Sequence, residues 1–298
     1  MFYRQSLIQG ALLILASELM FATMGAAVKG ASTGLPTEVL VFMRNAVGWL
    51  VVLPIVWRSG GRRLLITAVP HLHLLRAVAG VSAMYCFFYA LGHLHLANGL
   101  LLKMTAPLFM PLIGWLWLRE QAGWLATLAV PLGFGGVILV LDAGGGASGG
   151  TSTAALVGLL GGLLAAVAKL SVRRLTYSEP ATRIVFYFSS LALLVSSVPL
   201  IWAWQAPTLH EWGLLLLVGA AGTAGQFLLT RGYAAAPAAR VSPFGYFSVV
   251  YGALYGYLFW GETLTLVFWG GAVLIALAGA MALTGRATAR PTVDLALP

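Results

Sequence analysis

Ten apolar stretches follow one another along this chain, and each is long enough to cross a lipid bilayer as a helix. A spanning helix needs about 20 residues, because each residue advances about 1.5 Å through a hydrocarbon layer about 30 Å thick. Only 8% of the 298 residues are charged, whereas a water-soluble domain has about 25%. The sequence therefore predicts an all-α integral membrane protein with ten transmembrane helices. The predicted spans are 7–29, 36–57, 72–92, 97–118, 123–142, 154–173, 182–204, 209–230, 240–260 and 264–284.

The distribution of basic residues predicts the orientation of these spans. Lys and Arg outnumber Asp and Glu by 17 to 8. If the N-terminus is cytoplasmic, the connections on the inner side hold nearly all of the basic residues, and the outer connections "DAGGGASGGTST" and "QAPTLHE" hold none. Only Lys29 lies on the other side. This asymmetry follows the positive-inside rule, so we expect a bacterial cytoplasmic (inner) membrane protein with both termini cytoplasmic. The positive charge reports topology, and no nucleic-acid partner is expected.

The chain divides into two similar halves. A Gly- and Ser-rich segment, "AGGGASGG", separates a first unit at 1–142 from a second at 154–298, with 143–153 as the outer linker. "GAAVK" in the first half has a counterpart in "AAVAK", and "WLWLREQ" has one in "YLFWGET". Each half holds five predicted spans, so the second half enters the membrane from the opposite side. Inverted repeats of this kind are typical of transporters with a central cavity.

The repeated pattern also resembles a known family. The run "YALGHLHLANGLLLKMTAPLFMPLIGWLWLREQ" and its echo "RGYAAAPAARVSPFGYFSVVYGALYGYLFWGET" are similar to the EamA-type members of the drug/metabolite transporter superfamily. The resemblance implies two inverted five-helix repeats and a small-molecule substrate, with no cofactor and no required oligomer. Within the family the chain resembles the YddG-like amino-acid exporters, so export of neutral amino acids, aromatic ones included, is expected. Uptake of S-adenosylmethionine or a nucleoside-like metabolite stays open as the alternative.

Charged residues inside the predicted spans are candidate site residues, because an unpaired charge in the bilayer is costly. Glu18 lies halfway along the first span, where it suits recognition of a substrate amino group or proton transfer; a structural hydrogen bond to a neighbouring helix is the alternative. Arg44 suits a substrate carboxylate, since its guanidinium binds that group bidentately, or a structural salt bridge. Lys103 shares a helix face with Pro107 and Pro111, which free backbone carbonyls and indicate a cavity or gate.

The third predicted span carries one polar face. Ser82, Tyr85, Tyr89 and His93 recur at helical spacing, so their side chains share one side of the helix. Cavity lining is the functional interpretation, and interhelical hydrogen bonding is the structural one. No metal site is expected, because histidines two residues apart on a helix point in different directions.

The ninth span, "SPFGYFSVVYGALYGYLFWGE", combines rings and glycines. Phe247, Tyr251 and Tyr255 fall on one side, where an aromatic wall can hold an apolar group or a cation. Gly252 and Gly256 have the spacing that allows close helix packing. The sequence therefore predicts one helix that is both a pocket wall and a packing seam, with packing of the rings in the core as the alternative.

Five further residues in or beside the spans are expected to act structurally. Pro243 begins the ninth span and marks a bend or gate. Lys169 and Arg76 lie near the predicted inner surface and suit topology anchors. Glu120 and Glu262 close the fourth and ninth spans, where a carboxylate can cap the helix that follows.

Other function classes are less well supported by the residues. "HEWGL" lacks the second histidine of a zinc protease helix, so an intramembrane protease, and enzyme activity in general, is not expected. No nucleotide phosphate loop is present, so ATP-driven pumping by this chain alone is not expected. A passive channel remains open, and it differs from a carrier in that its flux does not saturate.

Overall fold

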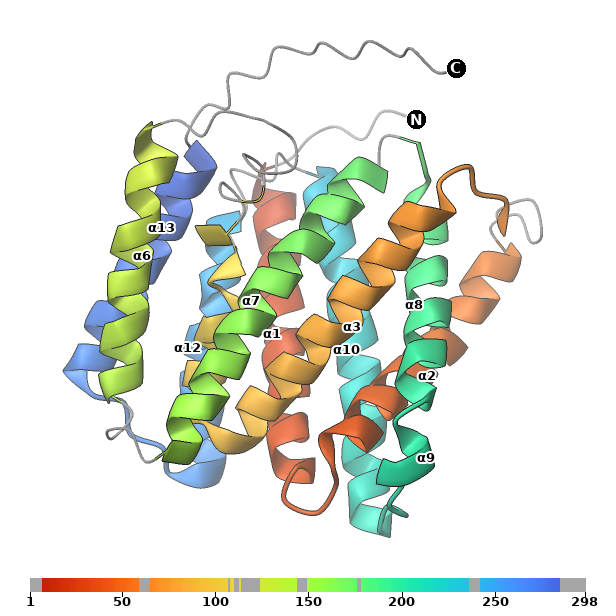
Figure 1. Cartoon of the computed structure of the whole chain (residues 1–298), viewed down its shortest axis with the longest axis horizontal. Helices are drawn as coiled ribbons and strands as arrows, with labels where there is room; N and C mark the ends of the chain where they lie inside the picture. Colours follow the sequence, from red (N-terminus) through yellow and green to blue (C-terminus); the bar gives the residue numbers. More distant parts are fainter. Residues whose placement is uncertain are drawn as a thin grey trace.

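The structure, a computed structural model, is a bundle of helices (Figure 1). It describes residues 7–58, 65–106, 108–109, 113, 124–143, 149–175, 178–235 and 242–284, and none of these forms a strand. The elements are α1 (Leu7–Ala31), α2 (Thr37–Arg58), α3 (Pro70–His93), α4 (Leu96–Lys103), α6 (Trp124–Ala143), α7 (Gly149–Leu175), α8 (Ala181–Ser197), α9 (Leu200–Ala203), α10 (Leu209–Ala235), the 3-10 helix η2 (Ser242–Tyr246), α12 (Phe247–Trp260) and α13 (Leu266–Thr284).

The outside of the bundle is apolar, as a lipid-facing surface must be. Large apolar side chains such as Leu12, Trp57 and Ile138 are exposed. Five described helices are long and apolar enough to cross a membrane, and three shorter apolar helices accompany them. The predicted all-α membrane fold is confirmed, while the count of ten spans stays a prediction because part of the chain lies outside the described residues.

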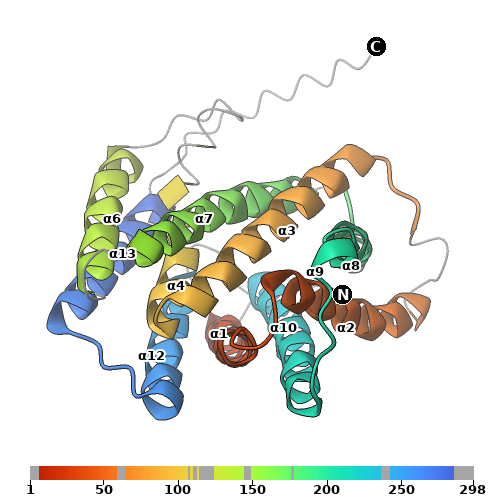
Figure 2. The ribbon, with the colours of Figure 1, turned by 60° about the horizontal axis from the view of Figure 1, so that its bottom comes forward.

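The helices pack in a pattern that relates the two halves. α1 packs along α10, and α7 packs along α3, so the first helix of each half lies on the third helix of the other (Figures 1 and 2). Further contacts between halves join α2 to α8, α4 to α12 and α6 to α13, and two matching sets join α2 to α10 with α3 to α8, and α1 to α12 with α4 to α7. Exchanging the two halves maps each of these contacts onto itself or onto its partner. This is the packing that an inverted repeat requires; the precise unit boundaries stay a prediction.

The bundle has two opposite faces, which are named here by one residue each. The Lys29 face is where α1 ends and α2, α4, α7 and α10 begin; the Arg58 face is where α2 and α7 end and α3 and α8 begin (Figure 1). α1 begins and α13 ends on the Arg58 face. The exposed side chains of Arg58, Arg174 and Arg231 belong to helix ends on this face.

Glycine allows α6 and α13 to approach each other closely. A Cβ atom at Gly136 would lie 2.7 Å from the carbonyl oxygen of Gly271 and 3.0 Å from the backbone nitrogen of Ile275. Backbone atoms cannot move aside as a side chain can, so the two helices would have to separate. A Cβ at the neighbouring Gly135 would meet nothing within 4 Å.

We therefore expect Gly136→Ala to lower the free energy of unfolding by about 1–3 kcal/mol through overpacking. Gly135→Ala is the matched control and should be neutral or slightly stabilising, because alanine restricts the unfolded chain. Thermal unfolding of the two purified variants in the same detergent measures the difference. Equal melting temperatures would show that this helix contact tolerates a methyl group.

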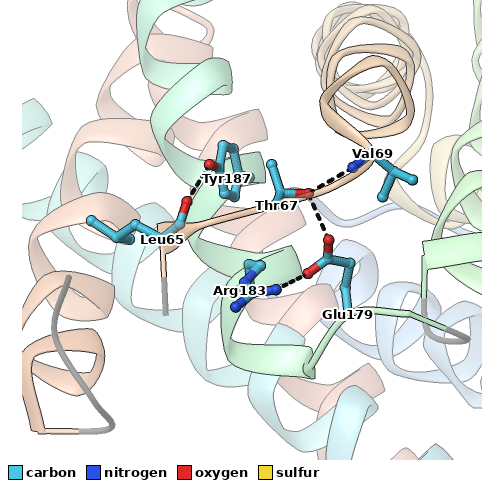
Figure 3. Close-up of polar contacts among 6 residues, drawn as sticks. All are labelled: Leu65, Thr67, Val69, Glu179, Arg183 and Tyr187. Atoms are coloured by element: carbon cyan, nitrogen blue, oxygen red, sulfur yellow. Dashed lines mark hydrogen bonds and ion pairs between the residues drawn. The ribbon is translucent and has the colours of Figure 1, made fainter. Parts of the chain in front are cut away.

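A polar cluster joins the segment before α3 to the start of α8 (Figure 3). Thr67 donates a hydrogen bond of 2.6 Å to Oε1 of Glu179 and accepts one of 3.1 Å from the backbone N–H of Val69. Arg183 forms an ion pair with the other carboxylate oxygen of Glu179. Tyr187 donates to the carbonyl of Leu65 at 2.5 Å. The cluster thereby ties the two halves together on the Arg58 face.

Glu179 should make stability on the acid side depend on pH. Burial by itself would raise the pKa of Glu179, but the hydrogen bonds from Thr67 and Arg183 and the positive charge of Arg183 outweigh it, so the net shift is downward. A carboxyl with a lowered folded pKa stabilises the fold above its unfolded pKa of about 4.3, and this contribution is lost as the pH falls through the folded pKa. We expect Glu179→Gln to melt below the wild type at pH 7 and the gap to close below about pH 4. A gap that is constant down to pH 3.5 would contradict this.

Candidate functional site

Glu18 lies at the centre of the bundle without a visible partner. Its side chain, on the central helix α1, is only 4% exposed, and its Oε2 atom accepts no hydrogen bond among the described residues. Oε1 lies near the backbone of Gly245 in η2, 3.8 Å from where a Cβ would stand. Burying a carboxylate without a partner is costly. A group kept there at such a cost is a candidate for binding something that is not part of the protein.

Two lysines lie within electrostatic range of Glu18. Lys103 ends α4, and Lys169 lies about two turns before the end of α7; both charges act on Glu18. The ammonium group of Lys103 lies 4.1 Å from the ring centre of Phe21 and 5.5 Å from that of Phe87. Its close neighbours are therefore aromatic rings, and the described residues give it no ion pair. We name Glu18, Lys103 and Lys169 the central charge cluster. It is assembled from α1, α4 and α7, which belong to both halves.

Two arginines extend the positive charge on one side of this cluster. The guanidinium carbons of Arg44 in α2 and Arg76 in α3 lie 5.9 Å and 4.0 Å from the ring centre of Phe188. Arg44 donates to Oδ1 of Asn45 at 3.0 Å, whereas Nε of Arg76 is buried without a partner among the described residues. The charge of Arg44 acts on both Arg76 and Lys103. We name Arg44, Arg76 and Phe188 the arginine pair.

A small pocket opens beside the arginine pair. Arg44 and Phe188 line it together with residues of α2, α8 and α10. Its polar lining includes Ser189, Thr223 and Gln226. Apolar side chains, among them Val52, Val185 and Phe227, line the rest of it.

The tyrosines of α12 turn toward the core. The hydroxyl groups of Tyr255 and Thr23 are hydrogen-bonded at 3.0 Å, which joins α12 to α1. Tyr251 packs against the same core, whereas Phe247 is 44% exposed. The expected aromatic wall therefore consists of the two tyrosines next to α1, and Phe247 lies beside them at the surface, with its ring centre 6.4 Å from that of Tyr251.

The polar face of α3 is divided between different environments. Tyr85 packs on the main core near α1 and α2, and its hydroxyl is buried without a partner among the described residues. Tyr89 packs against a second core, and His93 is exposed, stacks on Tyr89 at 4.1 Å and bonds through Nδ1 to the Tyr89 carbonyl oxygen at 2.8 Å. Ser82 is half-buried. On this face, the Tyr85 hydroxyl has no hydrogen-bond partner in the part of the chain that the structure describes, whereas His93 contacts Tyr89 at the end of the helix.

The two glycines of α12 have different roles. A Cβ at Gly252 would collide with Cδ1 of Leu100 in α4, so this glycine allows α12 to pack closely on α4. A Cβ at Gly256 would collide with Oε2 of Glu262, so this glycine makes room for a carboxylate. Pro243 lies in η2, the 3-10 segment that precedes α12. Pro107, Pro111 and Glu120 lie outside the described residues.

Glu262 ties α12 to the opposite half on the Lys29 face. It forms an ion pair of 2.9 Å with Lys29 and accepts the backbone N–H of Leu96, the first residue of α4, at 2.9 Å. Lys29 also donates to the Leu94 carbonyl at 2.6 Å and lies 5.7 Å from the ring centre of Trp260. The carboxylate caps α4, a helix of the other half, rather than the helix that follows it in sequence. We name Lys29 and Glu262 the Lys29 tie.

Some of these residues were not assigned to a site from the sequence. Arg76 was expected to be an inner-surface anchor, yet its guanidinium is held over Phe188 inside the bundle. Lys169 was given the same role, and its side chain is exposed while its charge acts on Glu18 and Lys103. The rule applied to Arg44, that a charge within an apolar span is a candidate, would have selected both. The described residues contain no group of three metal-ligating side chains.

Fold and interior together define a multi-pass α-helical membrane protein with charged groups at its centre. The sequence profile of the EamA-like transporter family matches residues 8–142 and again residues 152–284. The chain therefore belongs to the EamA-like transporter family of the drug/metabolite transporter superfamily, as its resemblance predicted. It is a membrane transporter for a small molecule.

Several characterised proteins are similar over most of the chain. The pseudopaline exporter CntI of Pseudomonas aeruginosa is 36% identical over 275 residues, which are 90% of this chain and 94% of that protein. A riboflavin transporter of Vibrio cholerae is 31% identical, over 85% and 86% of the two chains. An S-adenosylmethionine uptake transporter of Rickettsia bellii is 24% identical over 75% of each. A crystal structure at 18% identity covers 93% of this chain with a TM-score of 0.66, a likeness of fold alone.

Proposed function

We propose that this transporter is a secondary carrier that exports amino acids or similar small molecules across the bacterial cytoplasmic membrane. The main support for this proposal is the central charge cluster. In it a carboxylate and two ammonium groups lie within electrostatic range of one another, with no direct ion pair among the described residues. A molecule with an amino and a carboxyl group would satisfy both kinds of charge. Its amino group would meet Glu18, and its carboxylate would meet Lys103 and Lys169.

The orientation of the protein in the membrane is supported by the charges on the two faces. Arg58, Arg174 and Arg231 are exposed on the Arg58 face, which is therefore the cytoplasmic side by the positive-inside rule. Both termini would then be cytoplasmic, and the Lys29 face would be external. The similarity to an exporter over 90% of the chain favours outward transport.

Alternating access is supported by an asymmetry between equivalent lysines. Lys29 and Lys169 occupy matching positions in the two halves, as the motifs "GAAVK" and "AAVAK" show. Lys29 is held in the Lys29 tie with a side chain that is 14% exposed, whereas Lys169 is exposed and has no ion pair in the described part of the chain. A paired Lys29 and an exposed Lys169 are what we expect of a carrier that is closed on its outer side and accessible from its inner side. In the opposite state Lys29 would be exposed and Lys169 would be paired.

The second candidate is uptake of a nucleoside-like metabolite, including S-adenosylmethionine. The relatives from Vibrio cholerae and Rickettsia bellii favour it, because their names record riboflavin and S-adenosylmethionine transport. The interior cations weigh against S-adenosylmethionine, whose sulfonium group is itself a cation. Competition between substrates separates the two candidates.

The test is counterflow in liposomes that contain the purified protein and a high internal concentration of an unlabelled amino acid. Uptake of labelled threonine, methionine, phenylalanine and glutamate is followed, with riboflavin and S-adenosylmethionine as competitors. Saturable exchange of an amino acid supports the carrier. Flux that rises linearly with concentration indicates a channel, and exchange blocked only by an adenosyl or flavin compound supports the uptake alternative.

A further inference from the structure

The interior of the transporter has an excess of positive charge. Arg44, Arg76 and Lys103 come from α2, α3 and α4, and the exposed Lys169 of α7 lies within electrostatic range of Lys103. Glu18 is the one carboxylate among the described residues that acts on the central charge cluster, so four cations against one anion leave three positive charges. The described ion pairs, Lys29 with Glu262 and Arg183 with Glu179, lie at the two ends of the bundle. They neutralise none of the four.

Neutral partners compensate this excess only in part. Phe21 and Phe87 face Lys103, and Phe188 faces both arginines. A ring attracts a cation through its quadrupole but carries no charge, so repulsion between the cations is not cancelled. Asn45 supplies a single amide oxygen to Arg44. Like charges that lie close together away from bulk water destabilise the fold unless an anion joins them.

The cations are also arranged in two separate places. Lys103 and Lys169 lie with Glu18 in the central charge cluster, whereas the arginine pair surrounds Phe188 on α8 beside the pocket with Ser189 and Thr223. A zwitterion with one carboxylate would engage the central charge cluster and leave both arginines unpaired. A guanidinium group binds a carboxylate through two parallel hydrogen bonds, so the arginine pair suits a second carboxylate on the same molecule.

We propose that the natural substrate carries at least two carboxylates together with an amino group, and that the arginine pair binds the second carboxylate. This inference rests on the proposed function and narrows its substrate class from neutral amino acids to acidic amino-acid derivatives. Glu18 takes the amino group, Lys103 and Lys169 take the first carboxylate, and Arg44 and Arg76 take the second. A substrate of this kind carries a net charge of −1, so its binding lowers the positive excess by one charge and places a carboxylate against each group of cations.

The test compares pairs of compounds that differ only in charge. Glutamate with glutamine, and aspartate with asparagine, are used as competitors in the counterflow assay with whichever labelled amino compound exchanges. We expect the acidic member to inhibit at a concentration about 10-fold or more below that of its amide, because loss of one charge-paired group typically changes affinity by about that factor. In Arg76→Gln the preference for the acidic compound over its amide should fall to below about 3-fold.

Arg58→Gln is the matched control, since it also removes one arginine but on the exposed Arg58 face; its preference for the acidic compounds should equal that of the wild type. Saturable exchange in which glutamine competes as well as glutamate would overturn this inference and leave the carrier function standing. An unchanged preference in Arg76→Gln would also overturn it. Absence of saturable exchange for every amino compound would reject the proposed function, and this inference with it.

Discussion

Glu18→Gln is expected to reduce saturable exchange by about 100-fold while the melting temperature stays level or rises. The amide keeps the shape of the side chain but cannot attract a substrate ammonium group as a carboxylate does. A factor of 100 corresponds to about 2.7 kcal/mol, within the range for a buried charged hydrogen bond. Stability should not fall, because Oε2 of Glu18 has no hydrogen bond to lose among the described residues, and a neutral amide is less costly to bury than a carboxylate.

The two measurements together distinguish a binding role from a structural one. If Glu18 were a protonated acid bonded to a neighbouring helix, glutamine would disturb that bond, and melting temperature and exchange would fall together. Glu211→Gln is the control, since this carboxylate lies near the surface at the start of α10 and accepts hydrogen bonds from Thr208. Its exchange should match the wild type. Full exchange by Glu18→Gln would remove Glu18 from the site.

The sequence predicted the class of fold well because the bilayer restricts the possible structures. A helix satisfies its backbone groups within its own segment in lipid, and the membrane sets its length, so long apolar runs predict spans directly. The same reasoning selected Glu18 and Arg44 as candidate site residues, since a charge within an apolar run must face the interior or a partner. Both side chains are buried, as this rule requires.

Periodicity could not predict what each helix face meets. The 3.6-residue period placed Tyr85, Tyr89 and His93 on one side of α3, but tilted packing against α1, α7 and α8 puts them in different surroundings. The hydrogen bond between Tyr255 and Thr23 joins residues 232 positions apart, and no local pattern encodes it. The site depends on such contacts between halves, which only the packed structure brings together.

Glu262 shows that local sequence patterns also fail to predict which helix a side chain caps. Its position before α13 predicted that it would cap that helix, because capping rules consider neighbours in sequence. In the structure the carboxylate instead accepts the first N–H of α4 and pairs with Lys29. Gly256 leaves the space that this carboxylate needs. The Lys29 tie therefore combines a cap, an ion pair and a tight helix contact in one place.

Glu262→Gln is expected to lower the free energy of unfolding by about 3–5 kcal/mol, the usual cost of removing one partner of a buried ion pair. The side chains of Lys29 and Glu262 are only 14% and 8% exposed, so water cannot replace the missing charge. Leu96 would also exchange a charged acceptor for a neutral one. Melting of the purified variant in detergent measures the loss, and Glu211→Gln is the control for removal of a carboxylate near the same face.

The double variant Lys29→Gln/Glu262→Gln tests whether the pair itself is responsible. Because it removes the unpaired ammonium group that Glu262→Gln leaves buried, we expect the double variant to be more stable than the sum of the two single changes predicts, by about 0.5–3 kcal/mol. The proposed alternating-access cycle requires this face to be shut while the substrate enters from the other side, so the double variant is also expected to change the rate of exchange. Additive losses of stability in the two single variants would show that the ion pair is not coupled, and that Glu262 acts through its hydrogen bond to Leu96 alone.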